Sequence, residues 1–320
     1  MKLLEWVNIK PVQSLKGKDL LTLFDYTTEE VHQLLDLATN LKFLTKEGKC
    51  PPLLAGKTLG MIFEKHSTRT RISFEVGMQQ LGGYGMFMHS RDLQLGRGES
   101  IPDTAKVFSG YLDGIMIRAN SHEMVKELAE HASIPVINGL TDLFHPCQAL
   151  ADLLTLQEVI GELKGKKLAY IGDGNNVAHS LAIAAAHMGM EIVIASPKGY
   201  EPVEWISEKI SQLAISSGGS YQVTDSPQQA VVNADCIYTD VWTSMGQEQE
   251  ATERLAAFSD FQVNDALVSL AKEEYVFLHC LPAHREEEVT ASVIDGPNSY
   301  VFQQAENRLH AQKAVLASLL

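Results

Sequence analysis

The sequence predicts an α/β protein of two domains, each a parallel sheet flanked by helices, joined by interdomain helices. Short apolar runs of strand length alternate along the chain with longer segments whose apolar residues recur at helical spacing. Such alternation is typical of parallel sheets that are covered on both faces. The length of 320 residues agrees with two domains, because a single core seldom grows beyond about 250–300 residues.

The first helix is predicted to follow Thr27, because Thr27 and Glu30 have the spacing of a capping box. Apolar residues at helical spacing continue this segment until Gly48. Residues 58–64 then form a short apolar run with the character of a buried strand. From Arg69 to Leu81 the period is helical again, so that residues 63–71 (FEKHSTRTR) are predicted to join a strand end to a helix start.

Later segments repeat the alternation. Helical stretches such as 178–189 separate most of the further strand-like runs, which are 114–118, 135–138, 167–173, 191–196, 235–241 and 275–282. The helix that begins at His145-Pro146 is expected to end near residue 150, where we place the domain boundary. We therefore expect a first domain over 1–152 and a second over 153–303, with a final helix over 304–320 that packs back on the first domain.

The chain is acidic, with 26 Lys and Arg residues against 40 Asp and Glu residues and a formal charge of −14. This balance argues against a nucleic-acid partner or an anionic membrane, because both require a basic surface. The four cysteines are scattered and form no CxxC pair, as expected of reduced thiols in a cytoplasmic protein. Neither a signal peptide nor a transmembrane helix is predicted.

A concentration of cationic and hydroxyl side chains in so acidic a chain needs an explanation. In Ser67-Thr-Arg-Thr-Arg71, a strand is expected to deliver hydroxyls, guanidinium groups and backbone N–H groups to a helix start. Helix N-termini favour anions, and guanidinium matches the geometry of phosphate. Taken alone, the segment favours a Ser/Thr N-cap followed by solvated arginines over an anion site.

Three other polar segments stand at predicted strand ends or helix starts. His145 precedes a proline at a helix start, and Gln148 lies one turn further on. His279-Cys280 and Asp240 each follow a buried strand, the place where α/β proteins bind ligands. Each segment also has a structural interpretation, as a capping histidine or as the end of a core strand.

Two familiar site types fit poorly. We expect no metal site from His145, Cys147, His279 and Cys280, because their spacing is not that of zinc ligands and adjacent strand residues face opposite sides. Gly172-Asp-Gly-Asn-Asn176 follows a strand, but Val177 replaces the third glycine of a dinucleotide motif and Asp173 would repel a pyrophosphate. No cofactor is predicted.

Together these segments resemble the carbamoyltransferase family and, within it, the ornithine branch. The resemblance covers residues 58–310 approximately, in the order of the family. The matching segments are Ser67-Thr-Arg-Thr-Arg71, Gln94-Leu-Gly-Arg-Gly-Glu-Ser100, Asp103-Thr-Ala105, Arg118, His145-Pro-Cys-Gln148, Gly172-Asp-Gly-Asn-Asn176, Asp240-Val-Trp-Thr-Ser-Met-Gly246, His279-Cys-Leu-Pro282 and Ala305-Glu-Asn-Arg308. The SMG and HCLP segments are specific to the ornithine branch.

The resemblance implies the activity and its residues. Carbamoyl phosphate and L-ornithine would give L-citrulline and phosphate, without a cofactor or metal. The catalytic residues implied are Arg69, Arg118, His145 and Cys280. Carbamoyl phosphate would be bound by Ser67, Thr68, Arg69, Thr70, Gln94, Arg118, His145, Gln148, Arg308 and the carbonyl of Leu281. Ornithine would be bound by Asn176, Asp240, Ser244, Met245 and Cys280.

Two alternatives remain beside ornithine transfer. A sister carbamoyltransferase could use another amine such as putrescine, although it would have no α-carboxylate for Asn176 to bind. A catalytically silent anion-binding relative should have lost some of the implied catalytic residues, and all are present. The family forms trimers or multiples of trimers with shared active sites, and the segment at Gln94 would reach into a neighbouring copy.

Overall fold

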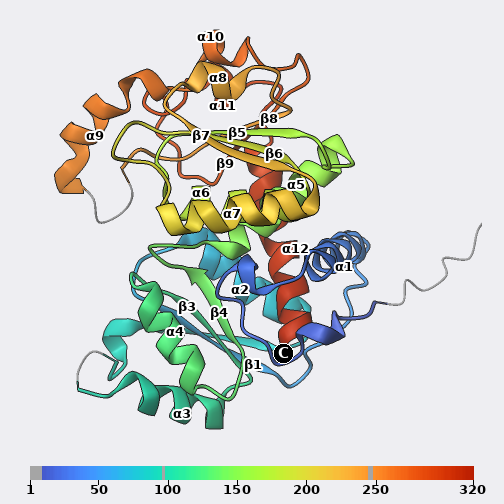
Figure 1. Cartoon of the computed structure of the whole chain (residues 1–320). Helices are drawn as coiled ribbons and strands as arrows, with labels where there is room; N and C mark the ends of the chain where they lie inside the picture. The colour runs from blue at the N-terminus through green and yellow to red at the C-terminus, as the bar shows by residue number, and fades with distance from the viewer. Residues whose placement is uncertain (1–8, 96–97, 244–247) are drawn as a thin grey trace, which may run out of the picture. The chain divides into compact units, whose positions relative to one another are not determined.

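Two parallel sheets, one of four strands and one of five, organise the chain (Figure 1). The computed structural model describes residues 9–95, 98–243 and 248–320. The chain divides into two compact units, Met1–Leu154 with Glu306–Leu320, and Thr155–Ala305. Helices alternate with the strands in both units, which confirms the predicted α/β fold class.

The first unit contains the sheet with strand order β2-β1-β3-β4, all parallel. Its strands are β1 Thr58–Phe63, β2 Tyr84–His89, β3 Gly114–Arg118 and β4 Val136–Leu140. Its helices are α1 Thr28–Lys46, α2 Thr68–Gln80, α3 Ile101–Tyr111 and α4 His122–His131, with the short 3-10 turns η1 Gln13–Leu15, η2 Leu23–Asp25 and η3 Ser90–Asp92. The borders of the unit fall inside two further helices, α5 Pro146–Ile160 and α12 Val301–Leu319.

Helix α1 begins as the sequence predicts. The Thr27 hydroxyl accepts a hydrogen bond from the Glu30 backbone N–H at 3.2 Å, and a Glu30 carboxylate oxygen accepts from the Thr27 N–H at 2.9 Å. These reciprocal bonds form the capping box and satisfy two N–H groups at the helix start. Behind the cap, the apolar face that includes Leu34, Leu35 and Leu41 is buried.

The second unit contains the sheet with strand order β7-β6-β5-β8-β9, again parallel. Its strands are β5 Lys167–Ile171, β6 Glu191–Ala195, β7 Ser220–Thr224, β8 Cys236–Thr239 and β9 Val276–His279. Its helices are α6 Asn176–His187, α7 Glu204–Ser217, α8 Pro227–Val231, α9 Ala251–Ala257, α10 Asp265–Val268 and α11 Ala291–Ile294, with 3-10 turns η4 Glu248–Glu250 and η5 Ser259–Phe261.

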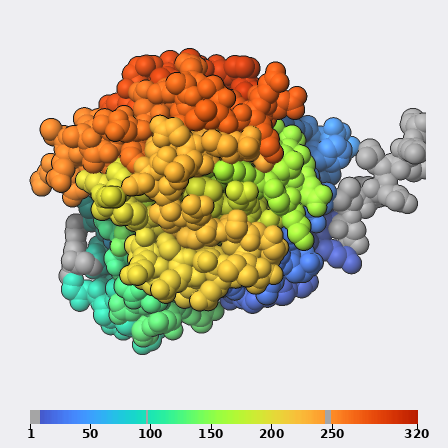
Figure 2. Space-filling model, turned by 45° about the horizontal axis from the view of Figure 1, so that its top comes forward, coloured from blue at the N-terminus to red at the C-terminus, as the bar shows by residue number. Residues whose placement is uncertain are grey.

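Two layers of helix enclose this five-stranded sheet. Helices α6 and α7 lie on one face, while α8 and α10 lie on the other (Figure 1). Helix α6 is buried from Val177 to His187, whereas α7 reaches the surface, where Figure 2 shows its atoms in yellow. Because helices cover both faces of the sheet, the inner strands are buried on both sides and consist of continuous apolar runs.

Three features differ from the sequence-based expectations. Strands β2 and β7 are not among the predicted runs, because each is an edge strand with an incompletely buried, partly polar sequence. Helix α5 does not end near residue 150 but continues to Ile160, since no helix-breaking residue occurs before Gly161. The left-handed backbone of Gly161, with φ of +85°, then marks the end of the helical segment.

Parallel pairing brings the carboxyl ends of the strands in each sheet to one edge. In the first unit, β1 leads to the start of α2 and β3 ends at Arg118. In the second, β5, β8 and β9 are neighbours, and the segments that follow them begin at Gly172, Asp240 and Cys280. Within the described residues, no helix combines the length and the apolar character that crossing a membrane requires.

Candidate active site

The turn after β1 runs directly into α2. The Ser67 hydroxyl accepts a hydrogen bond from the Thr70 backbone N–H at 3.3 Å, and Ser67 is therefore the N-cap of the helix. Thr68 is exposed and Arg69 is half-buried at the same point. The capping interpretation and the anion-site interpretation are thus compatible, because the same helix start carries a cap, a cationic side chain and backbone N–H groups.

Arg308 on α12 joins two other predicted site residues of the first unit. Its Nη1 donates to Gln148 Oε1 at 2.7 Å, and its Nη2 donates to Thr70 Oγ1 at 3.1 Å. Gln148 Nε2 in turn donates to Asp152 Oδ1 at 2.8 Å, and all four side chains are buried. These contacts fix the orientation of the Gln148 amide, with its oxygen directed toward Arg308.

His145 is buried just before α5 and close to a set of positive charges. Burial lowers its pKa well below the ordinary value, and the charges of Arg308, Arg118 and Arg69 lower it further. The imidazole is therefore neutral at physiological pH and can form a hydrogen bond without adding another positive charge. The structure thus gathers four predicted residues around one electropositive point of the first unit.

Gln94 stands apart from this group. It is exposed, on the segment between η3 and α3, and within the described part of the chain it forms no hydrogen bond with the side chains around Arg308. Residues 96–97, shortly after Gln94, lie outside the described part of the chain. The expectation that this segment serves a neighbouring copy therefore stays a prediction.

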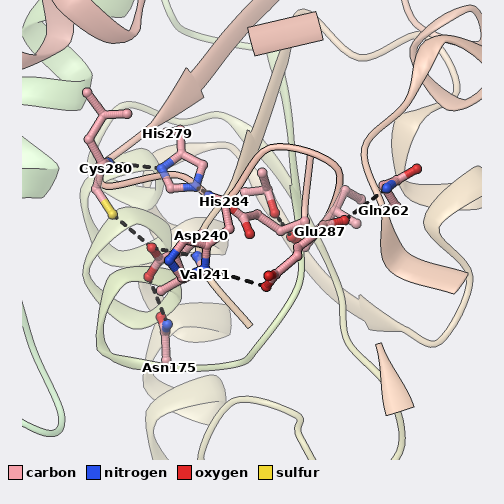
Figure 3. A network of polar contacts seen from close by, with 12 residues as sticks. Asn175, Asp240, Val241, Gln262, His279, Cys280, His284 and Glu287 are labelled. Carbon is pink, nitrogen blue, oxygen red and sulfur yellow. Dashed lines mark hydrogen bonds and ion pairs between the residues drawn. The ribbon is translucent and has the colours of Figure 1, made fainter. Parts of the chain in front are cut away.

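In the second unit, Asp240 is the centre of a polar network (Figure 3). Its Oδ1 accepts from the Val241 backbone N–H at 2.8 Å and from the Cys280 thiol at 3.0 Å. Its Oδ2 accepts from Asn175 Nδ2 at 3.0 Å. Asp240 is only 5% exposed, so a buried carboxylate is held by three donors at the carboxyl ends of three neighbouring strands.

Asn175 has a second contact that fixes its orientation. Its Oδ1 accepts from the backbone N–H groups of Val177 and Ala178, at 2.9 and 3.1 Å, and so caps helix α6. The amide nitrogen must then point toward Asp240. Asn176, the residue predicted to bind ornithine, is the first residue of the same helix and is half-buried. Asn175 was not among the predicted site residues, because its partner Asp240 lies 65 residues away in the sequence.

His279 and Glu288 form a fully buried pair that the sequence analysis did not identify. His279 Nδ1 accepts from the Leu281 backbone N–H at 2.9 Å, so Nε2 carries the proton and donates to Glu288 Oε1 at 3.1 Å. Both side chains are inaccessible to solvent. The pair therefore orients the segment that immediately follows β9, where Cys280 lies.

One premise of the sequence analysis was wrong. His279 and Cys280 were expected to face opposite sides of a strand, but β9 ends at His279. Possible ligand atoms of His279, Cys280 and Asp240 consequently lie within 4.8 Å of one another. Both ring nitrogens of His279 already take part in hydrogen bonds within the chain, so a metal ion there would have to displace one of them.

Leu281 adopts the left-handed conformation, with φ of +57°. A leucine has a Cβ that crowds the backbone in this region, and such a conformation is uncommon outside glycine. The hydrogen bond from its N–H to His279 helps to hold it. This strained residue carries the carbonyl that the sequence analysis assigned to the carbamoyl group.

Arg254 on α9 is another residue that the sequence analysis missed. It is buried, its Nη2 pairs with Asp173, and its Nε donates to the Trp242 carbonyl at 2.6 Å. Burial raises the pKa of Asp173 to about 6 in spite of the neighbouring guanidinium, so the ion pair is intact at neutral pH. Arg254 thereby ties the start of the segment after β8 to the turn after β5.

The remaining two predicted ornithine ligands, Ser244 and Met245, lie outside the described residues.

The turn after β5 also bears on the dinucleotide alternative. A Cβ on Gly174 would stand 2.1 Å from the Pro202 backbone nitrogen. This glycine is therefore required by the approach of the protein's own backbone, and Asp173 is engaged by Arg254 rather than facing a ligand phosphate.

Comparison with known proteins gives a consistent result over the whole chain. Residues 18–158 match the model described as "Aspartate/ornithine carbamoyltransferase, carbamoyl-P binding domain". Residues 164–319 match the model described as "Aspartate/ornithine carbamoyltransferase, Asp/Orn binding domain". The two models together cover most of both structural units.

Individual relatives agree with these matches. The ornithine carbamoyltransferase of Bacillus subtilis is 64% identical over 96% of this chain and 95% of its own, and that of Anoxybacillus flavithermus is 62% identical over 98% and 100%. The solved structure of ornithine carbamoyltransferase from Pyrococcus furiosus is 57% identical, covers 95% of this chain and 97% of its own, and superimposes with a TM-score of 0.93. The chain therefore belongs to the aspartate/ornithine carbamoyltransferase family.

Proposed function

We propose that this chain transfers the carbamoyl group of carbamoyl phosphate to the δ-amine of L-ornithine, giving L-citrulline and phosphate. The observation that carries the proposal is the buried carboxylate of Asp240, held by donors from Asn175, Val241 and Cys280. A fixed anion at the ligand-binding edge of a parallel sheet suits the α-ammonium group of an amino acid. The names of the relatives above 55% identity support ornithine as that amino acid.

Carbamoyl phosphate is assigned to the first unit. The helix start at Ser67–Thr70 and the guanidinium groups of Arg69 and Arg118 would bind the phosphate. Thr70, Arg118 and His145 would surround the carbonyl oxygen. Gln148 and the Leu281 carbonyl would accept hydrogen bonds from the carbamoyl nitrogen, and Gln148 is supported in this role by its fixed orientation against Arg308.

Ornithine is assigned to the second unit. Asp240 and Ser244 would bind the α-ammonium group, and Asn176 with the backbone of Met245 would bind the α-carboxylate. An amide at a helix start is a suitable partner for a carboxylate, since it adds a side-chain donor to the helix dipole. Cys280 would then lie near the δ-nitrogen, and its thiol is already oriented by Asp240.

The reaction forms a C–N bond, breaks the C–O bond to phosphate and moves one proton. The neutral δ-amine attacks the carbonyl carbon, and negative charge develops on the carbonyl oxygen. The C–O bond then breaks, and the proton lost by the amine leaves with the released phosphate as hydrogen phosphate. Arg118 and the neutral imidazole of His145 would stabilise the charge on that oxygen. Because only the uncharged amine is nucleophilic, we expect activity to rise above neutral pH.

Assembly and location form a further part of the proposal. We expect a homotrimer or a multiple of trimers in the cytoplasm, with the segment at Gln94 completing a neighbouring site. Exposed apolar side chains on α2, β2 and α3 support an interface between copies: Ile72 is 53% exposed, Tyr84 61% and Tyr111 79%. All four cysteines are free of disulfides, which agrees with a reducing compartment.

One assay tests the activity. Citrulline formation would be measured from carbamoyl phosphate with ornithine, and the rates of carbamoylation compared for putrescine, aspartate and N-acetylornithine. We expect turnover with ornithine to exceed that with each of the other amines. No turnover with ornithine, or faster turnover with putrescine, would refute the assignment.

A further inference from the structure

The turn that follows β9 contains three possible metal ligands that the proposed reaction does not use. The turn is closed by hydrogen bonds from the Glu286 N–H to the Val289 carbonyl at 2.8 Å and from the Glu287 N–H to the His284 carbonyl at 3.1 Å. This closure places His284 Nδ1 3.5 Å from Glu287 Oε2, with both side chains 49% exposed (Figure 3). One ligand atom each from His284, Glu287 and Glu288 lies within 4.8 Å of the other two.

Glu288 is the buried member of this cluster. Its side chain is inaccessible to solvent, and its Oε1 accepts from the His284 backbone N–H at 2.7 Å and from His279 Nε2 at 3.1 Å. Its Oε2 is buried and has no hydrogen-bond partner among the described residues. A buried carboxylate oxygen without a partner is costly, and a cation is the group that would satisfy it.

Neighbouring side chains do not provide that cation. Arg285, the nearest cationic residue along the chain, is directed to Asp295, with contacts of 2.8 and 2.6 Å between the guanidinium and the carboxylate. His279 already donates its one ring proton to Oε1 of Glu288. An ion from solution could instead approach from the exposed side, where His284 and Glu287 lie.

The spacing suits a transition-metal ion. Two ligands at about 2.1 Å from a tetrahedral centre stand about 3.4 Å apart, close to the distance between His284 and Glu287. One imidazole with two carboxylates is a ligand set for Zn²⁺, Mn²⁺ or Co²⁺ rather than for Ca²⁺, which prefers oxygen alone. Three protein ligands would leave a coordination position for water.

We propose that His284, Glu287 and Glu288 form a binding site for a divalent transition-metal ion. None of these three residues is among those proposed to bind carbamoyl phosphate or ornithine. It differs in chemistry from the cluster of Asp240, His279 and Cys280, because it contains no thiol. By binding the free oxygen of Glu288, the ion would reinforce the turn after β9 and stabilise the folded chain.

Isothermal titration of the full chain with Mn²⁺, after removal of metals with EDTA and dialysis, tests the site. We expect one equivalent to bind, and the affinity to fall at least tenfold in His284→Ala and in Glu287→Gln. Both side chains are half-exposed, so these variants should fold. The matched controls His131→Ala, at the exposed end of α4, and Glu286→Gln, in the same turn, should bind like the parent chain.

A Co²⁺ complex distinguishes the two clusters. The proposed site should give the visible bands of a cobalt ion with nitrogen and oxygen ligands, without the near-ultraviolet charge-transfer band of a cobalt thiolate. The proposal would be overturned if the parent chain bound no Mn²⁺ at millimolar concentration, or if His284→Ala and Glu287→Gln both bound Mn²⁺ with the affinity of the parent chain. A thiolate band that survives His284→Ala would overturn it as well, because the metal would then be bound at Cys280.

Discussion

Replacement of Asp240 by asparagine is the sharpest test of the proposed ornithine site. The carboxylate offers only acceptors, and it faces donors on both of its oxygens: Val241 and Cys280 on one, Asn175 on the other. The amide of Asp240→Asn carries two N–H donors on one side and must therefore oppose a donor in either orientation. Asn175 cannot turn away, because its oxygen caps α6.

The magnitude follows from the loss of charge in a buried position. A hydrogen bond to a charged group contributes about 1.5–3 kcal/mol, so the loss of the contact to the α-ammonium group should raise the KM for ornithine about 10- to 150-fold. The KM for carbamoyl phosphate should change little. Asp225→Asn is the matched control, because that carboxylate is 63% exposed and its ion partner, Lys198, is 3.8 Å away.

A substrate analogue separates recognition of the ammonium group from general damage. With 5-aminopentanoate, which lacks the α-amino group, the parent chain should be far less efficient than with ornithine, and Asp240→Asn should remove most of that preference. Steady-state citrulline assays with ornithine give the KM, and carbamoylation assays with the analogue give the preference for ornithine. An ornithine KM within twofold of the parent value, with the preference retained, would refute the reasoning.

Three further predictions concern other parts of the chain. Arg118→Ala should lower kcat/KM by roughly a hundredfold, about 3 kcal/mol, because a donor to the developing negative charge is lost. It should also raise the pKa of His145, followed by NMR, because the charge of Arg118 lowers that pKa. Near-normal activity would show that Arg118 is not an active-site residue. Thr27→Ala should lower the free energy of unfolding by about 1 kcal/mol in urea titrations, since the cap of α1 is lost, and an unchanged midpoint would contradict this. Burial, with the charges of Lys313 and Lys42, lowers the pKa of His310 to about 4, so between pH 6.5 and 4 the unfolded chain binds a proton that the folded chain does not. The urea midpoint of the parent chain should therefore fall more over this pH range than that of His310→Gln. Equal losses in the two proteins would refute the lowered pKa of His310.

The parts of the fold that the sequence predicts are those set by local chemistry. The capping box at Thr27 and Glu30 needs only four consecutive residues, and the inner strands are apolar runs because both sheet faces are covered. The edge strands β2 and β7 lack a continuous apolar run. Each pairs with a neighbouring strand on one side only, so its place in the sheet depends on that neighbour rather than on its own sequence. The continuation of α5 past residue 150 was missed for the opposite reason, because an assumed boundary outweighed an unbroken helical pattern.

The candidate site divides in the same way. Residues directly after strands could be selected from the sequence, because parallel pairing brings strand ends together. Arg254 and Glu288 could not, because their partners depend on folding: Arg254 pairs with Asp173 across 81 residues, and Glu288 meets a histidine beyond a turn. The facing of Cys280 was misjudged, since the strand pattern was extended one residue beyond the end of β9.

The strained backbone of Leu281 has a consequence for engineering. Relief of a left-handed leucine by glycine removes a steric cost of about 1 kcal/mol, although the added freedom of the unfolded chain offsets part of the gain. A selection for thermostability alone could thus accept Leu281→Gly, while a selection for turnover should reject it, because the carbonyl would lose its fixed direction. Position 281 is therefore one at which stability and activity are expected to be in conflict.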